Sequence, residues 1–296
     1  MSFTKIIIKK CIALTTRYSP EIGSRILYFI TMKRPLNLKK PILFSEKLMY
    51  LKLESYIKNP LVWRCVDKLQ VRDFLKSRLV AEANMPTIIG IYSDASEIDF
   101  TTLPQKFALK CTHGAGFNII CDNKAELDKD RAIQKLNKWL KTPFGLETAE
   151  THYGKVRPSI VCEAFIEGER GNLPSDYKVY CFNGKPHFIM ACTERLNGLS
   201  KVNLFDTEWV DTGYIKDSYA SQKPISAPKT LSDMLEMASR VSKGFPFVRV
   251  DFYEDKGVAI LGELTFTPHA CVNTNMTEEG QVRLGELIKL KDHCTF

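Results

Sequence analysis

The chain has 296 residues, of which 44% are hydrophobic and 26% are charged, and its net charge is +8. This composition is typical of a globular protein with a substantial core, in one large domain or two to three small ones. Nine cysteines without C-x-x-C spacing and five scattered histidines exclude a disulfide scaffold and a zinc module, and they indicate reduced thiols in a cytoplasm.

The positive charge is concentrated near the start of the chain. Residues 1–47 hold ten Lys or Arg and two Asp or Glu, so they account for the whole excess, and residues 48–296 are balanced. A protein that binds nucleic acid is typically basic over one face or carries a recognisable binding motif, and this sequence shows neither. We therefore expect no nucleic-acid partner.

Residues 1–34 form a basic and apolar segment. Ser19-Pro20-Glu21 has the residue types of a helix start: a capping hydroxyl, a first-turn proline and a first-turn acid. Without a small-residue cleavage site or an apolar run of about 18 residues, we expect neither a signal peptide nor a membrane span. Two interpretations remain open: peripheral contact with an anionic membrane at its inner face, or a helical cap packed on the main body.

Two helices and a strand are predicted next. The first helix is expected at residues 45–56, with Ser45 as its cap, and the second at residues 61–83, where it carries Lys68. Met85-Pro86-Thr87 ends the second helix and leads into a short strand at residues 88–92.

A glycine-containing hairpin loop is the first candidate binding feature. Strands are predicted at residues 107–110 and 117–121, and the loop between them, Thr112 to Gly116, contains two glycines. Glycines let backbone N–H groups approach a phosphate closely, and Lys110 precedes the loop as a counter-charge. The loop is not a Walker sequence and most such loops are ordinary turns, so both interpretations stay open at this point.

The middle of the chain is predicted to be a loop or hinge followed by strands. Residues 142–158 are polar and broken by proline and glycine, and the strand at residues 159–166 contains Glu163, whose charge needs a partner there. Asn183-Gly184 predicts a tight hairpin, with Asp176 and Lys178 on one face of its first strand. Further strand structure is expected at residues 201–213, and helices at residues 231–243 and 278–290.

The hairpin at residues 245–270 carries the clearest chemical pattern. Apolar and polar residues alternate around Arg249 and Asp251, and Asp255-Lys256-Gly257 marks the turn. A three-residue loop places Asp251 and Glu263 diagonally on one face, about 7–8 Å apart at the backbone, whereas a four-residue loop places them on opposite faces. Two carboxylates beside an arginine, with Thr265 further on, suit Mg²⁺ and the phosphates it carries. The alternative is a half-exposed hairpin with solvated charges.

The order of these pieces resembles the TupA-like ATP-grasp family of bacterial surface-polysaccharide loci. The resemblance runs from about residue 36 to residue 290 and is carried by DKLQVRDFL, LPQKFALKCTHGAGFNII, SDYKVYCFNGKPHFI and VRVDFYEDKGVAILGELTFTP. It implies an α+β ATP-grasp fold, in which two α+β subdomains sandwich ATP. We accordingly expect a helical, basic extension over residues 1–60, a subdomain with the glycine-rich loop over residues 61–160, and a subdomain with the metal site over residues 161–296.

The resemblance also implies a role for each candidate residue. Lys68 and Lys110 would hold the ATP phosphates under a lid formed by His113, Gly114, Ala115 and Gly116. Glu163 would lie near the adenine, Asp176 at the ribose hydroxyls, and Lys178 at a phosphate or the substrate. Arg249, with Lys110, would stabilise the transferring phosphoryl group. Asp251 and Glu263 would bind one or two Mg²⁺, with Thr265 where such enzymes often carry Asn.

The implied activity is that of a cytoplasmic ATP-dependent carboxylate–amine ligase. The γ-phosphoryl group of ATP would pass to a carboxylate, and an amine would attack the acyl phosphate to form an amide. By analogy alone, the carboxylate belongs to a sugar acid and the amine to an amino acid or another amine, in capsular or cell-surface polysaccharide biosynthesis. Three alternatives stay open: a glycosyltransferase, a non-catalytic nucleotide-binding assembly factor, and a phosphotransferase that stops after phosphorylating its acceptor.

Overall fold

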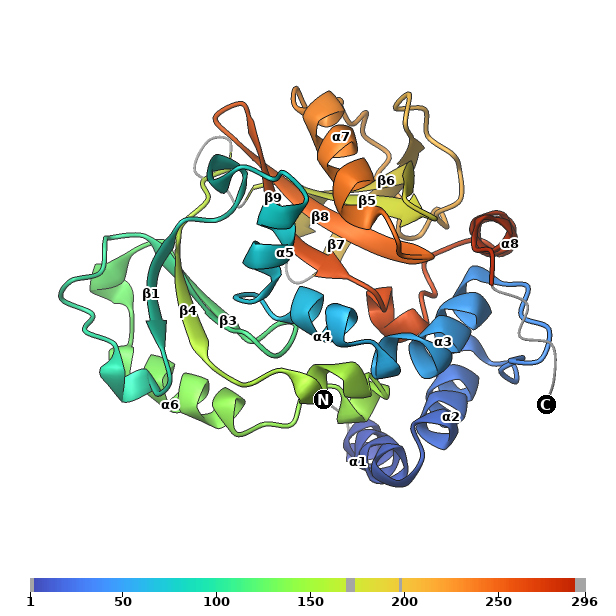
Figure 1. Cartoon of the computed structure of the whole chain (residues 1–296), viewed down its shortest axis with the longest axis horizontal. Helices are drawn as coiled ribbons and strands as arrows, with labels where there is room; N and C mark the ends of the chain where they lie inside the picture. Colours follow the sequence, from blue (N-terminus) through green and yellow to red (C-terminus); the bar gives the residue numbers. More distant parts are fainter. Residues whose placement is uncertain (1–2, 169–173, 197–198, 291–296) are drawn as a thin grey trace.

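The computed structural model describes residues 3–168, 174–196 and 199–290, and its strands form two antiparallel sheets (Figure 1). The first sheet has four strands in the order β1-β4-β2-β3, and the second has five in the order β7-β6-β5-β8-β9. The strands are β1 Ile88–Tyr92, β2 Phe107–Cys111, β3 Asn118–Cys121, β4 Ile160–Ala164, β5 Asp176–Phe182, β6 Lys185–Leu196, β7 Leu199–Asp206, β8 Phe247–Asp255 and β9 Val258–Thr265.

Helices lie between the two sheets and around them (Figure 1). The α-helices are α1 Phe3–Tyr18, α2 Pro20–Met32, α3 Phe44–Glu54, α4 Pro60–Val66, α5 Val71–Ser77, α6 Lys129–Leu140, α7 Leu231–Ser242 and α8 Glu278–Leu287. Single 3-10 turns occur at Tyr56–Lys58, Glu82–Asn84, Ala95–Glu97, Lys124–Glu126, Leu146–Thr148, Thr151–Lys155 and Pro268–Cys271. Among the described residues, no helix is long and apolar enough to cross a bilayer.

The five-stranded sheet is covered on both faces. On one face, α7 packs against the side that carries Val248 and Val250, and the Cys181 thiol reaches the Ala238 carbonyl oxygen of that helix. On the other face, Phe44 of α3 packs against the ring of Phe247, with ring centroids 5.2 Å apart. Because side chains alternate along a strand, the second face continues from these aromatic residues toward Arg249 and Asp251. The sheet thus has an apolar end under α3 and a charged end beyond it.

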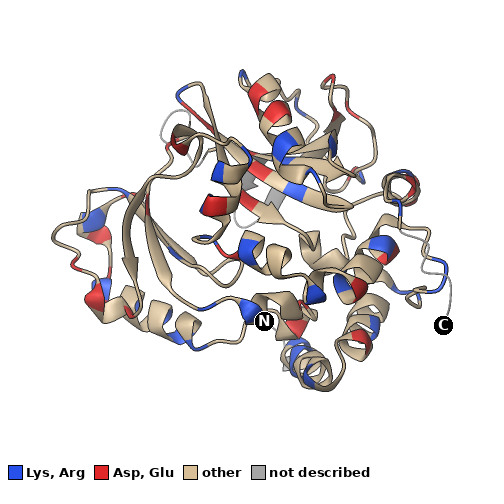
Figure 2. Cartoon of the chain, in the orientation of Figure 1, with Lys and Arg blue, Asp and Glu red and all other residues tan. Residues whose placement is uncertain are grey.

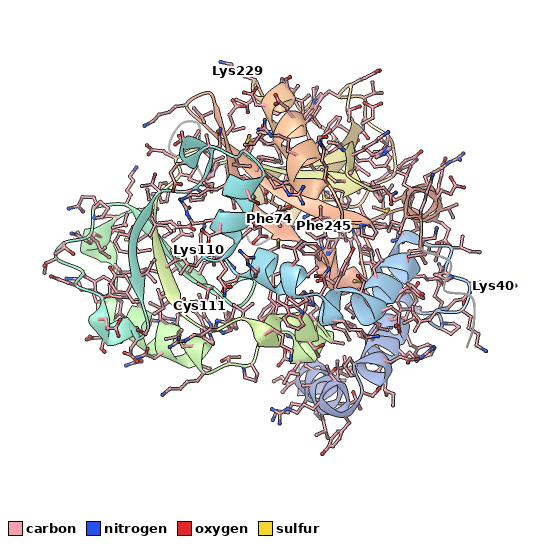
Figure 3. The ribbon with its side chains drawn as sticks, viewed as in Figure 1. Lys40, Phe74, Lys110, Cys111, Lys229 and Phe245 are labelled. Atoms are coloured by element: carbon pink, nitrogen blue, oxygen red, sulfur yellow. The ribbon has the colours of Figure 1, made fainter. Side chains whose placement is uncertain are left out.

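The prediction of one continuous helix at residues 61–83 is wrong. The chain forms two short helices, α4 and α5, because Asp67 is extended and its side chain accepts hydrogen bonds from the N–H groups of Leu69 and Gln70. A carboxylate in that position stabilises a turn that precedes α5, and this local hydrogen bonding outweighs the apolar periodicity of the sequence. The interruption places Lys68 in the turn between α4 and α5. The second of these helices packs through Phe74 on Phe245, with ring centroids 6.0 Å apart (Figure 3).

The predicted cap of the next helix upstream is also wrong. Helix α3 begins one residue earlier than Ser45, and Glu46 closes its start by accepting hydrogen bonds from the N–H groups of Ile42 and Leu43. Ser45 instead shares a hydrogen bond with the Tyr28 hydroxyl, at 3.1 Å. The predicted start of α2 is confirmed, because the Ser19 hydroxyl accepts the N–H of Ile22 at 3.2 Å.

Candidate functional site

The register of the β8–β9 hairpin sets the geometry of the candidate site. The turn has two residues, Lys256 and Gly257, both with positive φ, so the loop is neither of the two lengths considered from the sequence, three or four residues. A regular ladder from this turn would place Asp251 opposite Gly262 and Glu263 on the other face. A bulge at Gly262 adds one residue to β9, and Asp251 then lies directly opposite Glu263. The two carboxylates therefore share one face, as predicted, for a different structural reason.

Gly262 is required by this bulge. A Cβ atom at this position would lie 2.8 Å from Cε2 of the Tyr253 ring. Since real Cβ contacts are essentially never that short, a side chain at residue 262 would displace either the ring or the strand. The sequence Leu261-Gly262-Glu263 thus combines the extra residue with the space that it needs.

Asp251 is the centre of a buried ion-pair network. Its carboxylate accepts two hydrogen bonds from Arg249, Nε at 2.7 Å and Nη2 at 2.6 Å, and a third from Lys178 Nζ at 3.2 Å. Lys178 lies opposite Asp251 on β5 and also donates to Asp176. Burial alone would raise the pKa of Asp251, but Arg249 and Lys178 outweigh it and hold that pKa below its usual range. The acid is therefore ionised across the physiological range.

Glu263 and Thr265 complete the charged end of the sheet. The Glu263 side chain is 42% exposed, and its Oε1 lies 4.0 Å from Arg249 Nη2. Thr265 accepts a hydrogen bond from Arg249 Nη2 at 3.2 Å and donates to Glu263 Oε1 at 3.4 Å. Glu263 is thus the most accessible acid of this group.

The donor atoms suit a hard, oxygen-binding divalent cation such as magnesium. Asp251, Glu263 and Thr265 offer oxygen ligands alone. Within the described ranges, no group of three or more His, Cys, Asp or Glu side chains forms a metal cage. Magnesium is typically bound by one or two carboxylates, with phosphate oxygens supplying further ligands. The residues present fit a metal ion that arrives with a polyphosphate.

Two further candidate residues come together on the four-stranded sheet. Lys110 extends from β2 (Figure 3) and donates a hydrogen bond to Glu163 Oε2 of β4 at 2.5 Å. Their backbones are diagonal neighbours, because Lys110 pairs with Val161 two residues away from Glu163. Glu163 therefore has the partner that its position in an apolar strand demands. The structure thus brings together Lys110, which the resemblance assigns to the phosphates, and Glu163, which it assigns to the adenine.

Lys68 connects the two sheets. Its Nζ donates to the Gly114 carbonyl oxygen of the glycine-rich loop at 2.5 Å, and its backbone N–H donates to Thr112 O at 3.3 Å. Burial lowers the pKa of Lys68 below its usual value, and the negative charge of Glu263 from β9 offsets only part of this decrease. A narrow crevice lined by Lys68, Gly114, Ala115, Tyr153 and Glu263 joins the loop to the hairpin. The glycine-rich loop and Glu263 of the hairpin thus line the same crevice.

The glycine-rich loop rests on an aromatic cluster. A Cβ atom at Gly114 would lie 2.7 Å from the Phe144 ring, and Gly116 has a φ of 75°. The His113 ring turns away into this cluster: its Nε2 lies 3.1 Å from Trp139 O, and its centroid lies 5.5 Å from that of Phe117. Burial lowers the pKa of His113. The loop therefore has backbone groups, rather than this imidazole, to offer to a ligand.

The sequence reading missed the contribution of residues 142–158. Tyr153 lines the crevice, and its ring packs edge-on against Phe144 with centroids 4.9 Å apart. Glu150 of the same segment accepts a hydrogen bond from the Thr267 hydroxyl at 2.5 Å, just beyond β9. The sequence signal for this contribution was the presence of two aromatic residues, Phe144 and Tyr153, in an otherwise polar segment. Through the contacts of Tyr153 and Glu150, this segment connects the two sheets.

Comparison with known proteins places the chain in a family. Three solved structures are similar to it at low identity: the D-alanine–D-alanine ligase from Bacillus anthracis (14% identity, TM-score 0.43, 82% of this chain and 67% of that chain), the L-amino acid ligase from Bacillus licheniformis (14%, 0.46, 82% and 54%) and a D-cycloserine synthetase (12%, 0.43, 82% and 77%). A search of curated proteins gives no significant match. The family model of TupA-like ATPgrasp proteins matches residues 46–289, which is most of the sequence. The chain therefore belongs to the TupA-like ATP-grasp family, and its helices and two antiparallel sheets form the predicted α+β ATP-grasp fold.

Proposed function

We propose that this protein is an ATP-dependent carboxylate–amine ligase that works through an acyl phosphate. The observation that carries the proposal is the pairing of Asp251 with Glu263 on β8 and β9, because Glu263 lines the same crevice as Lys68. The nucleotide lies between the two sheets, with residues 61–160 and 161–296 as the two subdomains that enclose it. The neighbouring Arg249 completes the set of charges that phosphoryl transfer requires.

In this proposal, each group of the chain has a defined task. Lys68 and Lys110 neutralise phosphate oxygens from one side, while the loop Thr112–Gly116 offers backbone N–H groups and excludes water. Arg249 stabilises negative charge on the transferring group. Asp251 and Glu263 would hold Mg²⁺, which supplies charge neutralisation at the phosphates when bound. Phosphoryl transfer needs little covalent help from the protein, so positioning and electrostatics supply most of the rate.

The remaining candidates would hold the rest of the nucleotide. We assign Glu163 to the adenine end, Asp176 to the ribose and Lys178 to a phosphate or the substrate. The substrates are assigned from the resemblance alone. We propose a sugar acid and an amino acid or other amine, joined in cytoplasmic steps of capsular or cell-surface polysaccharide biosynthesis.

The glycosyltransferase alternative has less support. Its common metal motif is D-x-D, and the sequence has one such triplet, Asp128-Lys129-Asp130. Asp128 caps α6 by accepting the Arg131 N–H at 3.0 Å, and all three residues are exposed on the outside of the four-stranded sheet. The triplet has a structural task there, so it gives no support to a nucleotide-sugar site.

The decisive experiment is a screen of sugar acids and amines for ADP release from ATP and MgCl₂. The ligase predicts ADP only when a carboxylate is present, and hydroxylamine then traps the acyl phosphate as a hydroxamate. If the chain does not use ATP but releases a nucleoside diphosphate when a nucleotide sugar is supplied, the result would support the glycosyltransferase. Phosphorylated acceptor that hydroxylamine does not trap would support the phosphotransferase, and an unreactive chain that still binds ATP would support the assembly factor.

Two lysines at the same sheet provide a matched pair of variants. Lys110→Met removes the lysine that pairs with Glu163 and that we assign to the ATP phosphates, and it is expected to lower ADP release by about 100-fold or more. Lys106→Met removes a lysine that pairs with Glu167 on the surface, and it is expected to leave the rate within about two-fold. Equal effects of the two substitutions would refute the role of Lys110.

A further inference from the structure

The outward side of α1 carries an apolar stripe. Ile7, Leu14 and Tyr18 are exposed, the last two by 58% and 85% of their surface. Their spacing of seven and four residues places them on one side of the helix. Ile12 and Thr16 lie on the opposite side and are buried against the protein. The helix is therefore anchored by one side and presents the apolar stripe to its surroundings.

Basic residues flank this stripe. Lys10 and Arg17 are exposed, and their positions along the helix place them beside Leu14. Residues 1–34 contain seven Lys or Arg and one acid, Glu21. Figure 2 shows lysine and arginine on both α1 and α2.

Helix α2 repeats the pattern. Ile22 and Phe29 are exposed, Phe29 by 60%, and their seven-residue spacing aligns them on one side. Arg25 lies between them in the sequence and is exposed. In total, six of the fourteen exposed large hydrophobic residues of the described chain belong to these two helices. Such a concentration on two helices that pack on each other indicates an interaction site.

We propose that this outer face of α1 and α2, defined by Ile7, Leu14, Tyr18, Ile22 and Phe29 with their neighbouring basic residues, docks on an anionic lipid surface. Apolar side chains enter the boundary of the acyl chains, and the Lys and Arg side chains meet lipid phosphates. A second copy of the same chain is a poorer occupant, because two faces of the same positive charge would repel each other.

Docking would hold the catalytic body in a fixed orientation. The two helices pack tightly, since a Cβ atom at Gly23 would lie 2.1 Å from Thr16 Oγ1. Lys9 on α1 forms an ion pair with Glu147 at 2.8 Å, and Tyr28 of α2 hydrogen-bonds Ser45 of α3. The face is thus joined to the segment that contains Tyr153 and to the helix that covers the five-stranded sheet.

The test is co-sedimentation of the full chain with vesicles. Phosphatidylcholine vesicles with 30% phosphatidylglycerol are compared with pure phosphatidylcholine vesicles at low and high salt. The double variant Leu14→Ser/Tyr18→Ser is expected to lose binding to the anionic vesicles. Lys10→Gln/Arg17→Gln is expected to bind them about 25-fold more weakly, at roughly five-fold per removed cation.

Control variants distinguish binding through this face from non-specific hydrophobic binding to vesicles. Val210→Ser removes another exposed apolar side chain, far from this face in the sequence, and it is expected to leave vesicle binding unchanged. ADP release in solution is expected to stay unchanged in all of these variants. The proposal is overturned if the wild-type chain does not bind anionic vesicles, or if Val210→Ser weakens binding as much as Leu14→Ser/Tyr18→Ser does. It is also overturned if sedimentation shows a dimer that Leu14→Ser/Tyr18→Ser dissociates.

Discussion

Replacement of His152 by phenylalanine is expected to make the protein more resistant to acid. His152 is fully buried beside Tyr153, with ring centroids 4.5 Å apart, and neither of its ring nitrogens has a hydrogen-bond partner among the described residues. Burial, with a smaller contribution from the nearby Lys52 charge, lowers the pKa of His152 from 6.5 to about 3. The folded chain therefore keeps this ring neutral where the unfolded chain protonates it.

The size and sign of the effect follow from this difference. Because the folded-state pKa is lower than the unfolded one, the unfolded chain binds one more proton between pH 6.5 and about 3. Stability from this residue is complete above pH 6.5 and is lost as the pH falls through that window. Each pH unit is equivalent to about 1.36 kcal/mol, so at pH 4.5 the loss amounts to about 2.7 kcal/mol.

The assay is urea unfolding of the wild-type protein and His152→Phe at pH 7 and pH 4.5. The free energy of unfolding of His152→Phe is expected to fall by about 2–3 kcal/mol less than that of the wild type between the two pH values. His187→Asn serves as a control, because burial lowers the pKa of His187 but that ring is only half-buried. An identical pH dependence in the wild type and His152→Phe would refute the reasoning.

Three further changes test the hairpin and its ion pairs. Asp251→Asn leaves Arg249 buried without its bidentate acid and Lys178 with Asp176 alone, so we expect about 3–5 kcal/mol lower stability in urea as well as lost ADP release. Wild-type stability would contradict the network. Lys178→Met keeps the bidentate Arg249 contact, so its loss of stability is expected to be about half as large, and an equal loss would argue against that ranking. Gly262→Val is expected to cost about 1–3 kcal/mol through its clash with Tyr253 and to lower ADP release, whereas unchanged unfolding would show that the bulge tolerates a side chain.

Local signals in the sequence predicted most of the elements. Asn183-Gly184 gave the β5–β6 hairpin, and Ser19-Pro20 gave the start of α2, because each motif fixes the backbone through its own residues. The break between α4 and α5 was missed, although Asp67 is a residue type that favours turns, because the apolar periodicity on both sides continues through it.

The candidate site was harder to predict than the elements. Which face Glu263 occupies depends on the turn length and on the bulge at Gly262 together, and no short-range pattern reports both. The crevice wall formed by Tyr153 depends on contacts between segments far apart in the sequence. Neither contact can be read from period or composition, because both are properties of the assembled sheets.

Each cation of the candidate site is paired with an acid or a carbonyl oxygen of the chain itself. Lys110 is held by Glu163, Lys68 by a carbonyl oxygen of the loop, and Arg249 and Lys178 by Asp251. A lone phosphate or sulfate that captured one of these cations would strand its carboxylate without a counter-charge. A polyphosphate that brings a divalent cation offers something to both signs at once. We therefore expect the same ion pairs that balance the charges of the candidate site to discriminate against the simple anions of the cell.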